Sequence, residues 1–439
     1  MNPLAQELNE VIKKGNKHIY EMLSDLGKKL YFPKGILSQS AEAKKSATKY
    51  NATIGIATES KSPMHLPSVM QYFNQLTPAE LFDYAPASGV QRLREKWKEK
   101  MIRENPQLKN KECSLPLVTQ GVTHGISIVA DLFASPFDKL ILPDQIWENY
   151  VLIFEVRKDI KIEYYPFYDD KGGFNLKGFQ KVLETCSPTG KILILLNFPN
   201  NPTGFSISKL EAKAIIDSIN KIALKGCNVI VIVDDAYFGL FFEEGEEEKI
   251  FKESLFGHLA GLHERILAIK VDGATKEEFV WGFRVGFITF ASAKTPADVY
   301  AALEKKTMGA IRSAISNCPL PSQTIVLKAL ESPTFHEEQQ RKIQLIGLRE
   351  KEVKRVLQNP QYKEVWTVYP FNSGYFMCLR LKTVNGEKLR QYLLEKYGIG
   401  VICTNPTDIR IAFSCLEINQ IEDLFETMYK AITELASQQ

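Results

Sequence analysis

Short, continuously apolar runs alternate along the middle of the chain with longer stretches in which apolar residues recur at helical spacing. The runs at 191–196 (KILILL) and 228–233 (NVIVIV) show no polar alternation, which is typical of strands covered on both faces. Between them, Ser208 and Glu211 have the spacing of a capping box that begins a helix, and Gly226 is suited to end it. Repetition of this order predicts an α/β fold with a doubly wound, mostly parallel sheet.

The pattern changes after about residue 322. A helical stretch interrupted at Pro333 is followed by a long charged helix to about Gln358, and then by a shorter series of strands and helices. This series predicts a second, smaller α+β domain. We therefore expect three parts: an N-terminal arm that also joins the small domain at 1–60, a large domain at 61–322 and a small C-terminal domain at 323–439.

Composition and charge exclude several classes of function. The 439 residues are 44% hydrophobic and 24% charged with a net charge of +3, so nothing indicates binding to nucleic acid or to an anionic membrane. The N-terminus lacks the apolar core of a secretory signal, and no apolar run is long enough to cross a membrane. Seven cysteines without a CxxC pair indicate reduced thiols in the cytoplasm, and we expect no metal site. The acidic run at 243–249 predicts a solvated loop.

The stretch from Ile266 to Phe290 holds the first candidate chemistry. Lys276 follows an apolar, strand-like segment and a run of small residues, and Arg284 comes eight positions later between small and apolar neighbours. Partial desolvation and a nearby cation lower the pKa of a lysine and make its amine a nucleophile. A Schiff-base lysine with a phosphate-binding arginine suggests pyridoxal phosphate chemistry, although most lysines are merely solvated surface charges.

Further candidates lie near the ends of the predicted strands, where ligands of doubly wound sheets bind. Each of these residues also has a purely structural interpretation. Asn201 lies in NFPNNPTG, a composition typical of a turn, and Asp234, which precedes Tyr237, is suited to cap a helix. Trp147 is suited to a hydrophobic core. The glycine turn of TQGVTHGI opens a helix whose N–H groups, with Thr123, can bind phosphate. Arg410, between apolar residues, is either ion-paired or a carboxylate clamp. Gly55 in ATIGIA lets the backbone come close to a ligand.

On these residues the chain resembles a fold-type I pyridoxal-phosphate enzyme of the class I/II aminotransferase family, from about Tyr84 to Phe413. The resemblance implies pyridoxal 5'-phosphate as the cofactor, Lys276 as the lysine that is joined to it and carries the proton, and Asp234 as the partner of its pyridine nitrogen. It also implies a role for each of the remaining candidates: Asn201 and Tyr237 at the phenolic oxygen, Trp147 stacked on the ring, Val122 (through its backbone), Thr123 and Arg284 at the phosphate, Arg410 at the substrate α-carboxylate, and Gly55 beside the substrate.

The resemblance further implies a homodimer with shared active sites. Tyr84 in YAPASGVQRLR matches the tyrosine that reaches the phosphate of the neighbouring subunit. Arg312 in IRSAISNCP is similar to the arginine with which aspartate and aromatic aminotransferases bind a distal carboxylate in the other subunit's pocket, although it also suits a helix surface. Two positions depart from the family pattern, because Gly273 replaces a phosphate-binding serine and Phe279 replaces a small residue.

We therefore expect an aminotransferase that moves an amino group between an L-amino acid and a 2-oxo acid by a ping-pong mechanism, favouring dicarboxylic or aromatic substrates. The same scaffold also supports carbon–sulfur β-lyases, which is the main alternative. A cofactor-sensing transcription regulator needs an added basic domain, for which the first 50 residues are too short. A non-catalytic scaffold is disfavoured because the matched polar positions are intact apart from Gly273.

Overall fold

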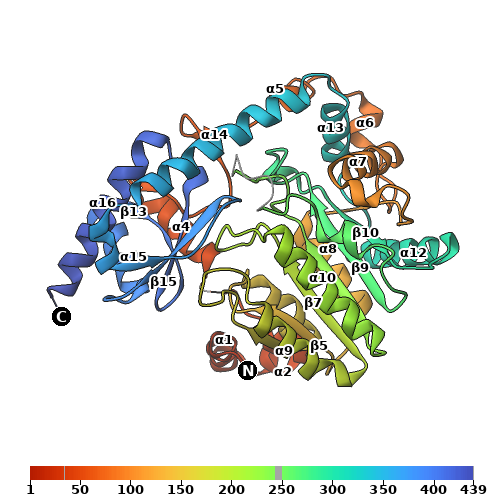
Figure 1. Cartoon of the computed structure of the whole chain (residues 1–439), viewed down its shortest axis with the longest axis horizontal. Coiled ribbons are helices and arrows are strands. Elements are labelled where there is room, and N and C mark those ends of the chain that lie inside the picture. Colours follow the sequence, from red (N-terminus) through yellow and green to blue (C-terminus); the bar gives the residue numbers. More distant parts are fainter. Residues whose placement is uncertain (34, 243–249, 439) are drawn as a thin grey trace.

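A seven-stranded sheet forms the centre of the larger part of the molecule (Figure 1). The computed structural model describes residues 1–33, 35–242 and 250–438, so the acidic run predicted as a solvated loop lies outside the described residues. The strand order is β4-β10-β9-β8-β7-β5-β6, and β10 alone runs against the other six described strands. The strands are β4 (Leu117–Thr119), β5 (Lys139–Pro143), β6 (Lys161–Tyr165), β7 (Lys191–Asn197), β8 (Asn228–Asp234), β9 (Ile266–Gly273) and β10 (Gly286–Ala291). This arrangement confirms the predicted fold class.

Helices cover both faces of this sheet, which is why its strands are continuously apolar. On β7, Ile192 and Ile194 belong to one core cluster with residues of α9 (Leu176–Cys186) and α10 (Lys209–Leu224), whereas Leu193 belongs to another with residues of α8 (Val122–Phe133) and α12 (Ala297–Ile315). The sequence pattern of α10 acts as predicted. The Ser208 hydroxyl accepts from the Glu211 N–H, and Glu211 accepts from the Ser208 N–H in return.

A four-stranded antiparallel sheet, in the order β11-β12-β15-β14, forms the centre of the smaller part (blue in Figure 1). Its strands are β11 (Trp366–Val368), β12 (Phe376–Leu381), β14 (Ile402–Asn405) and β15 (Asp408–Ala412). Separately, β1 (Tyr50–Asn51) pairs in parallel with β13 (Ile399–Gly400) in a two-stranded sheet, so the N-terminal part of the chain is joined to the C-terminal part. The predicted boundaries at 60 and 322 themselves stay a prediction.

The remaining helices connect and flank these two sheets. Helix α14 runs from the side of α5 and α13 toward α15 and α16 (Figure 1). Their bounds are α1 (Pro3–Gly15), α2 (Lys17–Met22), α3 (Asp25–Lys29), α4 (Ile36–Ser46), α5 (Pro67–Met70), α6 (Pro78–Phe82), α7 (Gln91–Glu104), α11 (Leu255–Leu259), α13 (Leu320–Leu330), α14 (Phe335–Val356), α15 (Gly386–Tyr397) and α16 (Ile418–Ala436), and a two-stranded hairpin joins β2 (Thr58–Glu59) to β3 (Ser62–Pro63). Of the helices described, none is both long and apolar enough to span a bilayer.

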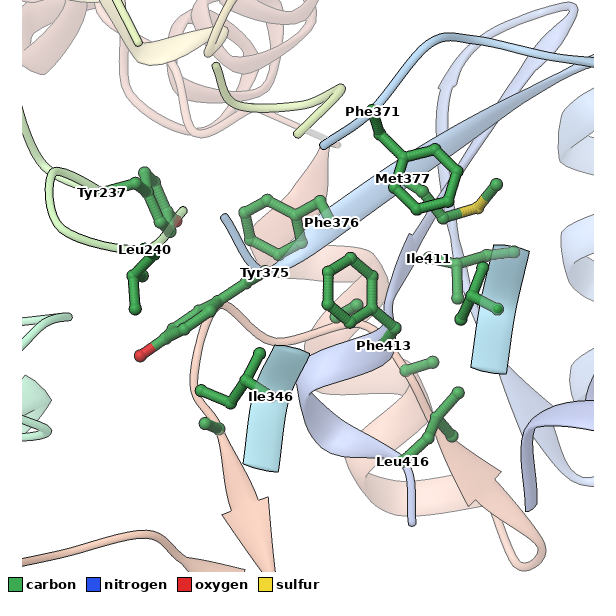
Figure 2. Close-up of a cluster of buried hydrophobic side chains, with 14 of the residues drawn as sticks. Tyr237, Leu240, Ile346, Phe371, Tyr375, Phe376, Met377, Ile411, Phe413 and Leu416 are labelled. Atoms are coloured by element: carbon green, nitrogen blue, oxygen red, sulfur yellow. The ribbon is translucent and has the colours of Figure 1, made fainter. Parts of the chain in front are cut away.

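The loops of the large sheet meet the small sheet in an aromatic contact (Figure 2). Tyr237, which follows β8, lies edge-on to Tyr375 and Phe376 with ring centroids 5.6 Å apart in both pairs. Phe376 begins β12, and the whole group belongs to one buried apolar cluster. The contact therefore fixes the carboxyl edge of the large sheet against the first residues of β12.

Candidate functional site

Ten of the twelve predicted site residues line one pocket of about 360 Å³. It lies beyond the carboxyl ends of the parallel strands, where loops of the large sheet face β12 and β15. The predicted residues that line it are Gly55, Val122, Thr123, Trp147, Asn201, Asp234, Tyr237, Lys276, Arg284 and Arg410. Residues that the sequence did not single out also line it, among them Ile36, Ile54, Ile56, Tyr150 and Phe376.

Lys276 presents its amine to this pocket three residues after the end of β9. Its Nζ donates a 2.5 Å hydrogen bond to the carbonyl oxygen of Gly55 and lies 5.0 Å from the centre of the Tyr237 ring. Burial, with the positive charges of Arg410 and Arg284, lowers the pKa of Lys276 to about 7. A large fraction of the amine is therefore neutral, and nucleophilic, at physiological pH.

Little space remains for a side chain at Gly55 beside that amine. A Cβ at this position would lie 3.1 Å from Nζ of Lys276 and 3.3 Å from both the Tyr237 hydroxyl and Cζ of Phe376. After β1, the chain passes the pocket as irregular backbone at 52–57, and the carbonyl oxygen of Gly55 faces Lys276.

Asp234 ends β8 with its carboxylate buried and hydrogen-bonded. The Tyr150 hydroxyl donates to Oδ2 at 2.6 Å, and the Ala236 N–H donates to Oδ1 at 3.0 Å. Burial raises the pKa of Asp234 to about 6, and these two hydrogen bonds oppose the rise. The carboxylate is thus held with a fixed orientation and a weakened tendency to ionise, so that a cation in the pocket would be a favourable partner.

Tyr150 is the main site residue that sequence reasoning missed. It follows Trp147 by three positions, and the two rings meet edge-on with centroids 5.5 Å apart. That spacing places both side chains on one side of a helical turn, which was the available signal. Its contact with Asp234, 84 positions away, required the folded chain.

Arg410 and Asn201 form a second polar group on the other side of the pocket. From β15, Arg410 donates through Nη1 to Oδ1 of Asn201 at 3.1 Å and through Nη2 to the carbonyl oxygen of Thr53 at 2.8 Å. Its guanidinium lies 4.1 Å from the centre of the Phe376 ring, and its buried Nε has no hydrogen-bond partner. This unsatisfied N–H group can donate a hydrogen bond to a bound anion. Because Oδ1 of Asn201 accepts from Arg410, its amide nitrogen remains able to donate.

The start of α8 and Arg284 form an anion cradle at the far end of the pocket. Gly121 precedes the helix with φ of 79°, and a Cβ there would lie 2.5 Å from Nη2 of Arg284, so only glycine fits. Val122 and Thr123 follow with the free N–H groups of the first turn. Arg284 itself adopts a left-handed conformation with φ of 55°, and its Nη1 donates to the carbonyl oxygen of Trp281.

The structure explains why position 273 carries no side chain. Gly273 pairs with Gly286 across β9 and β10, and a Cβ on Gly273 would lie 2.6 Å from the Val285 carbonyl oxygen. Two positions on, the Thr275 hydroxyl is buried at the pocket without a hydrogen-bond partner. The other departure, Phe279, is buried with φ of 58°. The only hydroxyl between Gly273 and Lys276 therefore belongs to Thr275, and it is unsatisfied.

Tyr84 and Arg312 do not reach this pocket within the chain. Tyr84 is 89% exposed. Arg312 is exposed at the end of α12, where Nη1 donates to the Ser316 hydroxyl at 2.5 Å. Neither side chain lines the pocket, and their predicted roles at a neighbouring subunit stay a prediction.

Comparison with known proteins gives one family. The sequence matches the family model described as aminotransferase class I and II over residues 52–428. It is 24% identical over 394 residues to the mitochondrial aspartate aminotransferase of Schizosaccharomyces pombe, covering 86% of each chain. Among solved structures, it is similar to an aminotransferase of Anaerococcus prevotii, with a TM-score of 0.79, 22% identity and coverage of 92% of this chain and 96% of that one. It is also similar to an aromatic-amino-acid aminotransferase of Burkholderia pseudomallei covalently bound to pyridoxal phosphate, with a TM-score of 0.72, 19% identity and coverage of 92% and 98%.

Proposed function

The chain belongs to the class I and II aminotransferase family, and from this premise we propose that it binds pyridoxal 5'-phosphate at Lys276 and transfers an amino group between an L-amino acid and a 2-oxo acid by a ping-pong mechanism. The predicted family and aminotransferase activity are confirmed by the comparisons. The observation that supports the site most strongly is that the amine of Lys276, whose pKa burial lowers to about 7, lies in the same pocket as the buried carboxyl group of Asp234.

The polar groups of the pocket fit this cofactor. The unsatisfied Thr275 hydroxyl, the start of α8 and Arg284 suit its phosphate, and Asp234 suits a protonated ring nitrogen. The Asn201 amide and the Tyr237 hydroxyl suit its phenolic oxygen, while Trp147 offers a flat ring for stacking. When bound, the cofactor supplies an aldehyde for the amino group and an electron-poor ring for the electron pair left at the α-carbon.

Each protein group then has a defined task. Arg410 binds the α-carboxylate through its planar fork, as its unpartnered Nε suggests. Lys276, with a pKa near neutrality, takes the α-proton and returns it. Asp234 would hold a positive charge on the ring nitrogen of the cofactor, and this charge would stabilise negative charge that develops at the α-carbon. The contact between Tyr237 and Phe376 places two aromatic rings in the wall of the pocket.

The purified protein tests this proposal directly. We expect a yellow protein whose visible absorbance falls when a productive amino acid is added and returns with a 2-oxo acid. Lys276→Ala should abolish covalent attachment of the cofactor. Turnover that depends on a 2-oxo acid means transfer, whereas pyruvate formed from cystathionine without a co-substrate would mean a β-lyase. A colourless protein that takes up no pyridoxal phosphate would refute the assignment.

We also propose a homodimer in which Arg312 determines the choice between dicarboxylic and aromatic substrates. Among the described residues that line the pocket, the lysines and arginines are Lys276, Arg284 and Arg410, and each already has a task. The isoleucines of the wall, Ile36, Ile54 and Ile56, suit an apolar side chain. A second carboxylate therefore needs a cation from another copy, and the exposure of Arg312 and Tyr84 makes them available for this.

The test of this specificity is the Arg312→Ala enzyme. We expect its KM for aspartate and glutamate to rise about a hundredfold while that for phenylalanine changes little, because a lost charge pair costs a few kcal/mol. Equal losses for both substrates would remove the assignment. Sedimentation should give a dimer.

The seven free thiols support the cytoplasm as the proposed compartment.

A further inference from the structure

A buried ionic cluster lies directly behind the loop that carries Lys276. We call it the Lys100 cluster, and it consists of Lys100 and Glu104 on α7 with Glu277 and Glu278, the two residues after Lys276. Nζ of Lys100 lies 2.8 Å from Glu277, 3.0 Å from Glu104 and 3.3 Å from Glu278. The side chains of Lys100 and Glu278 are only 5% and 2% exposed. None of these residues lines the pocket, so the site described above does not use them.

The cluster sets three carboxyl groups against one ammonium group. Three carboxylates share Lys100, and burial raises the pKa of Glu278 to about 7 and that of Glu277 well above its ordinary value, although Lys100 opposes both rises. Their charge in turn holds the pKa of Lys100 well above its ordinary value in spite of burial. Such an arrangement is a poor way to stabilise a fold, because apolar side chains of similar volume usually do as well or better.

Neighbouring contacts fix the cluster to α7 and to the end of β9. Trp97, one turn before Lys100, donates from its indole N–H to Asp272 at 3.1 Å, and Lys100 lies 4.9 Å from the centre of its ring. Asp272 is paired with Lys270 at 3.0 Å, and Lys270 also binds Asp235. Helix α7 is thus attached to β9 just before the residues that lead to Lys276.

The backbone of the loop that carries Lys276 accepts hydrogen bonds from residues outside the Lys100 cluster. The Tyr375 hydroxyl donates to the carbonyl oxygen of Lys276 at 2.7 Å, and the Gln339 amide donates to that of Glu277 at 3.3 Å. The Glu277 side chain covers Gly239, where a Cβ would lie 2.3 Å from Oε1 and where φ is 86°. Among the described residues, Lys100 is the cation that pairs with both glutamates. Its Nζ donates to Glu277 at 2.8 Å and lies 3.3 Å from Glu278, whose buried carboxyl oxygens have no hydrogen-bond partner in the described part of the chain.

We propose that Lys100 is a positioning residue for Lys276: by binding Glu277 and Glu278 together, it fixes the loop so that the Lys276 amine stays against the Gly55 carbonyl and the Tyr237 ring. The proposal rests on the proposed function of Lys276. It predicts that Lys100 acts on the rate at which the amine reacts and not on the binding of the amino acid, because the ion pairs of the cluster do not include Arg410.

The experiment compares cofactor attachment and turnover in Lys100→Met and Lys100→Arg. Apoprotein is mixed with pyridoxal phosphate, attachment is followed by absorbance, and borohydride fixation with peptide mapping identifies the modified residue. We expect Lys100→Met to attach the cofactor and to turn over at least about tenfold more slowly, with KM for the amino acid within about threefold, because a small displacement of a reacting group costs this much or more. Lys100→Arg, which keeps the charge, should recover most of both rates.

Lys96→Met is the matched control. Lys96 lies on the same helix in a surface pair with Glu99 at 2.7 Å, and its loss should change neither rate. If Lys100→Met does not fold, the same rates are read from Glu277→Gln, which keeps the shape but weakens the bond to Lys100. A folded variant with both rates within about twofold of the wild type, or an Arg variant as slow as the Met variant, overturns the inference. Wild-type protein that is not modified at Lys276 would instead refute the proposed function.

Discussion

The hydrogen bond from Tyr150 to Asp234 should make the stability of the apoprotein depend on pH in a specific way. Tyr150→Phe removes only the hydroxyl that donates to Oδ2 at 2.6 Å. The ring keeps its edge contact with Trp147 and its place in the core. Both residues are 2% exposed, so water cannot easily replace the lost donor.

The expected magnitude follows from the strength of the bond. A hydrogen bond to a charged group contributes about 1.5–3 kcal/mol and one to a neutral group about 0.5–1.5 kcal/mol. The difference, about 1–2 kcal/mol, corresponds to a rise of roughly one pKa unit in Asp234, whose pKa burial already raises to about 6. Because the folded pKa lies above the unfolded one, this carboxyl lowers stability as pH rises through the window between them. Tyr150→Phe extends that window upward.

The assay is denaturation of the apoprotein at about pH 5 and at about pH 8.5. We expect Tyr150→Phe to cost about 1 kcal/mol at the lower pH, where the carboxyl is largely protonated, and about 2–3 kcal/mol at the higher pH, where it is ionised. Tyr165→Phe is the control, since its hydroxyl is equally buried but has no hydrogen-bond partner. A cost for Tyr150→Phe that is the same at both pH values would refute the reasoning.

Three further predictions concern the amine and the anion cradle. Lys276→Met should stabilise the apoprotein by a few kcal/mol near pH 6, and progressively less toward pH 10. The reason is that the pKa of Lys276 in the folded protein, about 7, lies below its unfolded value, so the charged amine destabilises the folded wild type at low pH. Thermal melts in which the gain does not shrink as pH rises would contradict this. Gly55→Ala, whose Cβ would lie 3.1 Å from Nζ of Lys276, should slow cofactor attachment about tenfold, whereas Gly282→Ala, which meets nothing within 4 Å, should not. Thr275→Ala should weaken pyridoxal phosphate binding to the apoprotein about tenfold in equilibrium titrations, and Thr275→Ser should restore it; equal affinities for the two variants would show that the hydroxyl makes no contact.

The sequence predicted those features that depend on a single segment. The apolar runs at 191–196 and 228–233 are strands β7 and β8, and Asp234 ends the second of them, because a strand buried on both faces leaves its pattern in its own residues. The order of such strands along the chain then predicts which loops share one edge of the sheet. Candidates that follow these strands, such as Asn201, Asp234 and Lys276, were therefore expected at one edge and line one pocket, whereas the role of Val122 was implied by the family resemblance.

Features that depend on two distant segments were not predictable in this way. Nothing in the segment 276–279 (KEEF) indicates that both of its glutamates are buried. Their partner Lys100 lies 177 positions from Glu277, on a helix whose sequence is typical of an amphipathic helix. The reason for Gly273 is likewise absent from its neighbourhood. It follows from the register of β9 with β10, which brings the Val285 carbonyl oxygen within 2.6 Å of any Cβ at this position.

Opposing charges act on the amine of Lys276, and their balance should change when an anion binds. In the pocket, Arg410 and Arg284 lower the pKa of the amine, while Asp234 opposes them. An anion at Arg284 would cancel part of the positive field and leave Asp234 in place, so the pKa of Lys276 should rise while burial continues to depress it. Inorganic phosphate added to the apoprotein should therefore shift the pH at which Lys276 reacts upward.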